Sequence, residues 1–203
     1  MTRRLLLALL LAWLPVAAQE DERAHQNREI LYELQAPETH AFRITHDYTE
    51  THAGTAAYLN VVRTGSKVKD PEGLDLDTGR KLRWEVLGAA EVKRRGLASP
   101  EMRADSEVVV TYYERPVPAG GSVRVRLMET YADAASYYEK DGELVFDRTL
   151  GRPRNLVALP AGWRITGSLV PATVTTLADG RVLLTFENPR HDEVHVVLRA
   201  RRR

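Results

Sequence analysis

The sequence predicts an all-β protein, built as an antiparallel two-sheet β-sandwich of about eleven strands with at most one or two short helical turns. Apolar and polar residues alternate with a period of two along most of the chain. Such alternation is typical of strands with one buried and one solvated face, which is the habit of antiparallel sheets. Turn dipeptides separate these runs, and the sequence lacks the helical periods that the crossovers of a parallel sheet require.

The composition excludes several classes of protein. The 203 residues contain no cysteine, which removes disulfide scaffolds, thiol nucleophiles and cysteine-ligated metal centres. With 28% charged and 43% hydrophobic residues, the chain is neither a disordered polyelectrolyte nor a multi-span membrane protein. Its length suits one domain that buries a core without covalent cross-links.

Residues 1–18 predict a cleavable signal peptide, and therefore a periplasmic or secreted protein. Arg3 and Arg4 form a positive start, residues 5–14 are an unbroken apolar run, and residues 15–18 offer the small side chains that a signal peptidase reads. A membrane-spanning helix needs about 20 such residues, so we expect no integral membrane segment after cleavage. The cleaved segment would hold two of the 29 basic and none of the 28 acidic residues. The nearly neutral remainder gives no reason to expect a nucleic-acid partner.

The rest of the chain divides into a flexible polar leader at residues 19–28 and a β-sandwich body at residues 29–203. Alternation predicts strands around residues 42–48, 82–86, 123–127, 182–186 and 194–198. The helix-like pieces are residues 89–95 and a turn near residues 133–136. A sub-boundary near residues 133–141 leaves two abutting small sandwiches as an alternative.

Two dipeptides in the body predict two-residue hairpin turns. Asp141-Gly142 and Asp179-Gly180 each lie between runs of alternating residues. Type I′ turns need a positive φ at both central positions, which Asp-Gly pairs adopt readily.

The candidate metal ligands are Glu193 and His195, next to His191. Their order lacks the Glu directly after the first His that the helical zinc motif requires, and the context predicts a turn followed by a strand. Four residues of strand span about 13 Å, so His191 and His195 cannot share one ion there. Glu193 and His195 could do so if a third ligand came from elsewhere. A solvated polar face is the preferred interpretation, and we expect no bound metal or cofactor.

Motifs for nucleophilic catalysis are missing from the sequence, which has neither a Gly-x-Ser-x-Gly elbow nor a phosphate-binding glycine loop. Pairs of carboxylates for hydrolysis stay open, because their separation is a tertiary property. His46 shares a strand face with Phe42, Ile44 and Tyr48, and this pattern predicts a hydrogen-bonded core residue rather than a general base. We therefore assign no catalytic residue.

Two adjacent pairs of tyrosines, Tyr112-Tyr113 and Tyr137-Tyr138, are the candidate binding residues. On a strand, one member of each pair faces outward, and an exposed ring on a sheet can support a sugar ring. The preferred alternative is a half-buried tyrosine that packs across neighbouring strands.

Several segments resemble a family of uncharacterised secreted bacterial β-rich proteins. The resemblance is carried by residues 44–48 (ITHDY), 129–133 (ETYAD), 150–163 (LGRPRNLVALPAGW), 170–174 (VPATV), 179–182 (DGRV) and 186–189 (FENP). It implies a β-rich exported protein and carries no assigned activity or catalytic residue.

These observations favour a non-catalytic exported β-sandwich protein that binds another protein or an envelope component. Two alternatives stay open. One is a glycan-binding module that uses exposed aromatic residues, and the other is a hydrolase that uses carboxylates or a metal held by Glu193 and His195.

Overall fold

The computed structural model describes residues 28–188, 190 and 192–203, and its mostly-β architecture confirms the predicted class. These residues form fifteen strands, one short helix, α2 (Ala89–Arg94), and one 3-10 turn, η1 (Pro37–Thr39). The expected signal peptide, nearly all of the expected leader and His191 lie outside the described residues. Among the residues that the structure describes, no helix is both long and apolar enough to cross a membrane.

The strands form three sheets, so the prediction of a two-sheet sandwich is wrong. The largest sheet has the order β13 (Thr173–Thr176), β14 (Val182–Glu187), β11 (Arg154–Ala158), β1 (Glu29–Leu34), β2 (Ala41–Glu50), β8 (Val123–Ala132), β4 (Lys67–Asp75) and β5 (Lys81–Leu82). The second has the order β12 (Trp163–Ser168), β15 (Val194–Arg202), β10 (Glu143–Leu150) and β9 (Tyr137–Lys140). The third has the order β3 (Ala57–Val61), β7 (Glu107–Tyr112) and β6 (Trp84–Gly88).

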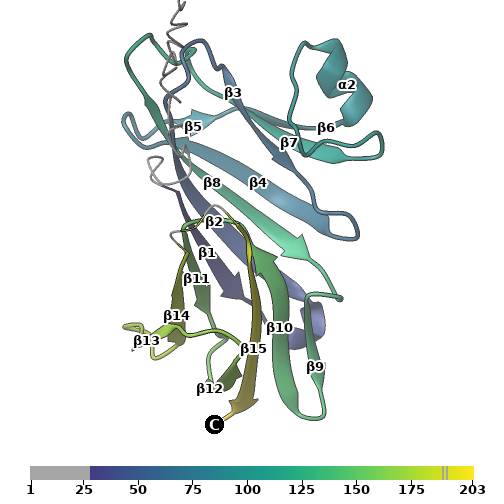
Figure 1. The fold of residues 1–203 in the computed structure, drawn as a ribbon, viewed down its shortest axis with the longest axis vertical. Coiled ribbons are helices and arrows are strands. Elements are labelled where there is room, and N and C mark those ends of the chain that lie inside the picture. The colour runs from purple at the N-terminus through teal and green to yellow at the C-terminus, as the bar shows by residue number, and fades with distance from the viewer. Residues whose placement is uncertain (1–27, 189, 191) are drawn as a thin grey trace, which may run out of the picture.

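The two small sheets lie at opposite ends of the eight-stranded sheet. Figure 1 shows the four-stranded sheet at the lower end, and the three-stranded sheet with α2 at the upper end. Period-two alternation shows that a strand has a buried face, but it does not tell which sheet covers that face. The local sequence pattern therefore could not predict the third sheet.

One pair of strands in the large sheet is parallel. β1 pairs with β11 in parallel and with β2 in antiparallel register, so Tyr32 lies opposite both Val157 and Ile44. More than a hundred residues separate β1 from β11 along the chain. The chain moves to the four-stranded sheet at β9 and β10 and returns to the large sheet at β11. It then crosses to the four-stranded sheet at β12, back to the large sheet at β13 and β14, and again to the four-stranded sheet at β15.

Of the two predicted hairpin turns, one is confirmed and the other is wrong in its length. Asp141 and Gly142 both have a positive φ, of 53° and 75°, and they join β9 to β10 as predicted. Gly180 has a φ of 82°, but the turn that contains it spans residues 177–181, because Leu177 N bonds to Arg181 O. The two-residue turn predicted there is wrong, although the hairpin between β13 and β14 exists.

The main core lies between the eight-stranded and four-stranded sheets. Phe42 and Phe146 are fully buried, and their rings meet edge to face with centroids 5.7 Å apart. Tyr32 and Tyr137 complete the same aromatic cluster. A second cluster around Val125 faces the three-stranded sheet. A third packs α2 against the other face of that small sheet.

The large sheet packs closely against the three-stranded sheet at Gly73 on β4. A Cβ atom built at Gly73 would lie 2.7 Å from Thr111 Cγ2 on β7 and 3.1 Å from Leu82 Cβ on β5. The absence of a side chain at Gly73 therefore sets how closely the two sheets pack.

We expect Gly73→Ala to lower the free energy of unfolding by about 1–3 kcal/mol, because the added methyl must push the two sheets apart. Gly167→Ala is the matched control, since a Cβ atom there meets nothing within 4 Å. Urea denaturation followed by tryptophan fluorescence measures both changes. Equal stability of the two variants would contradict this account of the packing.

Candidate functional site

A pocket of about 390 Å³ lies where the three sheets meet. Its floor is one face of the large sheet, formed by residues of β1, β2 and β8. The register explains the floor: His46 lies opposite Leu127, and Ile44 lies opposite Glu129. Side chains two residues apart on a strand share a face, so these four project into the same space.

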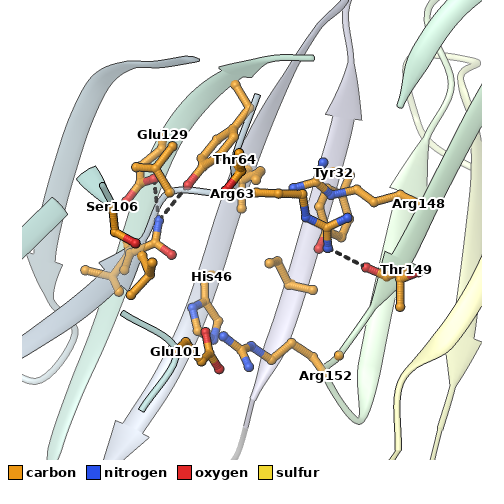
Figure 2. Close-up of a pocket in the computed structure, with 18 of the residues that line it drawn as sticks. Tyr32, His46, Arg63, Thr64, Glu101, Ser106, Glu129, Arg148, Thr149 and Arg152 are labelled. Carbon is orange, nitrogen blue, oxygen red and sulfur yellow. Dashed lines mark hydrogen bonds between the residues drawn. The ribbon is translucent and has the colours of Figure 1, made fainter. Parts of the chain in front are cut away.

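The walls of the pocket come from segments that are distant in the sequence. Asn60 belongs to β3, Arg63 to the loop after it, Glu101 to the segment before β7, and Arg152 to the loop after β10. Figure 2 shows Arg63 in the upper part of the view and Arg152 in the lower part, both next to the floor strands. Glu193 also lines the pocket.

Glu129 is a buried acid at a position where the pattern of β8 calls for an apolar residue. Its strand alternates buried and partly exposed positions, and Glu129 is only 5% exposed. Asn60 Nδ2 donates a hydrogen bond to Glu129 Oε2 at 2.7 Å and another to the Tyr131 hydroxyl at 2.9 Å. Burial raises the pKa of Glu129 to about 7, although the Asn60 and Tyr131 hydrogen bonds act in the opposite direction. No cation forms an ion pair with Glu129 within the described part of the chain.

His46 is buried beside Glu129 on the floor, and the structure confirms the prediction of a hydrogen-bonded core histidine. Its Nδ1 lies 3.3 Å from the Tyr58 hydroxyl, which in turn accepts a hydrogen bond from Arg152 Nη2 at 3.4 Å. Burial lowers the pKa of His46 well below its ordinary value, and the positive charges of Arg152 and Arg28 lower it further. His46 is therefore neutral at neutral pH.

Five buried side-chain atoms have no hydrogen-bond partner among the residues that the structure describes. Two of them, His46 Nε2 and Arg152 Nε, belong to side chains that line the pocket. The backbone that carries Arg152 is itself held, because Asn155 Nδ2 donates a hydrogen bond to Arg152 O at 2.7 Å. Buried polar atoms are normally satisfied, so this end of the pocket is ready to bind an external group.

Two further arginines of the pocket, Arg148 and Arg63, differ in role. Arg148 is buried and pairs with Asp133 at 3.0 Å, which makes it part of the framework. Arg63 lies at the exposed rim and donates a hydrogen bond to Thr149 O at 3.0 Å. Partial burial lowers the pKa of Arg63, as does the positive charge of Arg148. Arg63 thus adds a positive charge at the rim of the pocket.

The four candidate tyrosines lie in different places. In each pair one ring is buried: Tyr113 is 7% exposed and Tyr137 is 0% exposed. The Tyr137 hydroxyl donates to Gln35 O, so this residue anchors the core. Tyr112 belongs to the three-stranded sheet and Tyr138 to the four-stranded sheet. The two less buried rings therefore do not form one flat surface, and glycan binding by them stays a prediction.

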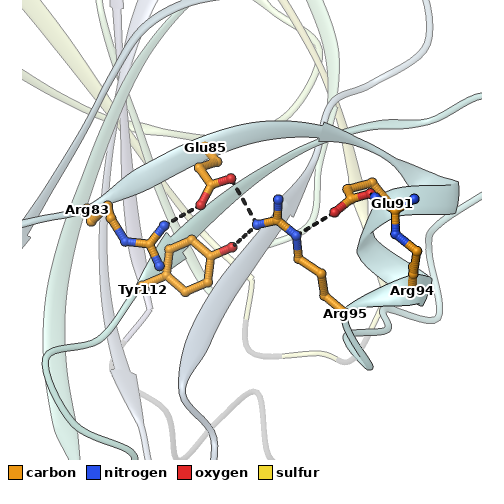
Figure 3. Close-up of polar contacts among 6 residues, drawn as sticks. All are labelled: Arg83, Glu85, Glu91, Arg94, Arg95 and Tyr112. Carbon is orange, nitrogen blue, oxygen red and sulfur yellow. Dashed lines mark hydrogen bonds and ion pairs between the residues drawn. The ribbon is translucent and has the colours of Figure 1, made fainter.

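Tyr112 takes part in a polar cluster that links α2 to the three-stranded sheet. The guanidinium of Arg83 lies 3.7 Å from the centroid of the Tyr112 ring, and Arg95 Nη1 donates to the Tyr112 hydroxyl at 2.9 Å. Figure 3 shows Arg95 between Glu85 on the sheet and Glu91 on the helix. These contacts give Tyr112 a structural role in holding α2 against the sheet.

The candidate metal ligands are not brought together with a third ligand. His195 is exposed, and its Nε2 lies 2.7 Å from Asp147 Oδ1. Glu193 lines the pocket instead. Over the ranges that the structure describes, no group of three or more His, Asp or Glu side chains could hold a metal ion.

Most of this pocket could not be predicted from the sequence. Its Arg and Asn residues come from three loops and two strands whose proximity is a tertiary property. One signal was present: Glu129 follows Val123, Val125 and Leu127 at alternate positions, so an acid stands in an apolar row. A buried, unpaired acid in such a row is a recognised indicator of a functional site.

Comparison with known proteins gives likenesses of fold only. No family model matches the chain, and no curated protein matches it. An M1 zinc metallopeptidase from Deinococcus radiodurans is 14% identical with a TM-score of 0.48, over 85% of this chain and 40% of that one. An aminopeptidase N family protein from Idiomarina loihiensis is 10% identical with a TM-score of 0.48, over 85% of this chain and 29% of that one. This chain thus spans two fifths or less of those proteins, and likeness at this level assigns neither a family nor an activity.

Proposed function

We propose that this is a non-catalytic exported binding protein, and that the pocket between the three sheets takes up a ligand or a protruding group of a protein or envelope partner. The observation that carries the proposal is the pair of buried, unpartnered nitrogens, His46 Nε2 and Arg152 Nε, in one pocket of about 390 Å³. An external group that bonds to them removes the cost of leaving them unsatisfied. The proposed export rests on the N-terminal sequence.

The chemistry of the pocket supports binding rather than nucleophilic catalysis. Ser106, Thr64 and Thr149 line it, but none of these hydroxyls is hydrogen-bonded to a histidine where the chain is described. His46 is held by Tyr58 and has a lowered pKa, which makes it a poor base. The pocket thus offers fixed hydrogen-bond donors and no activated nucleophile.

A pocket-filling substitution tests this proposal. Thr64 lines the pocket and is exposed, so Thr64→Trp should fill the entrance without disturbing the core. The control is Thr175→Trp on the exposed strand β13, which is not part of the pocket. The probe is a library of small polar compounds, charged and neutral, screened by amide chemical shifts in NMR. We expect shifts at residues of β2 and β8 that Thr64→Trp abolishes and Thr175→Trp retains.

The binding proposal fails if the library shifts no residue of β2 or β8, or if Thr64→Trp leaves these shifts unchanged. In the second case the compounds bind somewhere other than the pocket.

A hydrolase is the second candidate, on one observation. Burial raises the pKa of Glu129 to about 7, and a carboxyl poised near neutrality can act as a general acid or base. Chromogenic glycosides and aminoacyl anilides should then be hydrolysed, and Glu129→Gln should slow that reaction about 100-fold or more. Turnover that survives in Glu129→Gln would remove Glu129 from such a role.

A further inference from the structure

We infer that the His46 and Arg152 end of the pocket is an oxyanion subsite, so that the ligand carries a carboxylate or a phosphate group. This inference rests on the proposed binding function and adds the chemical class of the ligand. It depends on the identity of the two unpartnered atoms, since both prove to be hydrogen-bond donors.

The subsite requires the ring proton of His46 on Nε2. Arg152 can only donate, so the contact at 3.4 Å makes the Tyr58 oxygen an acceptor. The Tyr58 hydroxyl proton is then free to point to His46 Nδ1 at 3.3 Å, and we take Nδ1 as the acceptor of this contact. Because the lowered pKa keeps His46 neutral, its single ring proton lies on Nε2. Nε2–H is therefore a buried donor without an acceptor among the described residues.

Arg152 supplies the second donor and a positive charge. Its Nε–H is buried and has no acceptor in the described chain, although its Nη2 bonds to Tyr58. The acidic residue that acts on the charge of Arg152 is Glu101. Its side chain is exposed, so water screens this interaction. Arg63 at the rim adds a further cation, while Arg148 is neutralised by Asp133.

The requirements of this subsite are those of an oxyanion. A carboxylate or phosphate has several acceptor atoms, so one group can accept from both His46 and Arg152. A cation would face two donors and a fixed positive charge. A neutral amide could meet the donors but would leave the charge of Arg152 without a partner.

The test compares acetate and inorganic phosphate with acetamide, the neutral counterpart of acetate, by isothermal titration calorimetry. We expect acetate or phosphate to bind and acetamide to bind at least about tenfold more weakly. The two anions are separate arms that tell a carboxylate ligand from a phosphate ligand. Arg152→Met should weaken binding of the anion about tenfold or more. Arg154→Met is the matched control, because Arg154 is about half exposed and, among the described residues, forms ion pairs with Glu29 and Glu187.

A second measurement on the unmodified protein avoids reliance on any variant. The imidazole nitrogens of ¹⁵N-labelled protein report the tautomer of His46 directly. We expect the Nε2–H form without ligand, and a shift of the Nε2 signal when the anion is added. A proton on Nδ1, or an anion that binds without moving this signal, would overturn the subsite.

The outcomes also separate this inference from the proposed function. If acetamide binds as well as acetate, the anionic class is wrong while pocket binding stands. If compounds from the library fill the pocket but neither anion does, the oxyanion subsite is again overturned alone. If neither the library compounds nor the anions change the amide chemical shifts of β2 or β8, both proposals fail.

Discussion

Replacing Asp133 with alanine should lower the free energy of unfolding by about 3–5 kcal/mol, because it leaves the buried guanidinium of Arg148 without a counterion. Asp133 and Arg148 are 7% and 6% exposed and lie 3.0 Å apart. Asp133 also accepts hydrogen bonds from both Ser136 and Ser66. One carboxylate thus holds the turn between β8 and β9 and fixes Arg148 at the wall of the pocket.

An exposed pair of the same chemistry serves as the control. Arg126 bonds to Asp47 through two nitrogens at 2.6 and 2.7 Å, but their side chains are 41% and 32% exposed. We expect Asp47→Ala to cost only about 0–1 kcal/mol, since water screens such pairs. Urea denaturation of both variants gives the comparison. Similar costs for Asp133→Ala and Asp47→Ala would show that burial of the Arg148 pair has little effect.

The second large effect is a dependence of stability on pH that Glu129 causes. Its pKa is about 7 in the folded protein, against an ordinary value of 4.5 for the unfolded chain. Between these values the folded state keeps a proton that the unfolded state has lost. The free energy of unfolding should therefore fall as the pH rises from about 4.5 to about 7, by about 3 kcal/mol in total for this group.

Glu129→Gln isolates this contribution, because glutamine has nearly the same shape and does not titrate. His46 acts with the opposite sign in the same pH range: its lowered pKa means that the unfolded state binds more protons as the pH falls below about 6.5. Only the difference in the free energy of unfolding between the unmodified protein and Glu129→Gln isolates the contribution of Glu129. We expect Glu129→Gln to be the more stable of the two at pH 7 and to lose that advantage by about pH 4.5. A difference that does not change with pH would contradict the raised pKa.

These two effects concern opposite sides of one pocket. Asp133 fixes Arg148 in the wall, and Glu129 is a buried acid in the floor without a cationic partner in the described chain. A protein optimised only for stability has no need for an unpaired buried acid, whereas a binding site does. The pocket therefore costs stability at neutral pH, and this cost supports a functional interpretation of the site.

The sequence by itself determined the mostly-β class and much of the local structure. The strand expected around residues 42–48 is part of β2, the helix-like residues 89–95 contain α2, and Asp141-Gly142 forms the predicted turn. These features follow from interactions between residues close in the chain: alternation sets one buried face, and a positive φ at two positions selects the hairpin.

Only the tertiary structure decided how many sheets there are, that β1 and β11 pair in parallel, and where the pocket lies. Alternation is the same whichever sheet covers a strand, so the local pattern could not distinguish two sheets from three. His46, Glu129 and Arg152 come from β2, β8 and the loop after β10, and they meet only because of strand register and sheet packing. The chemistry of the site depends on these long-range contacts, since a donor or an acid becomes unsatisfied only when the fold removes it from water.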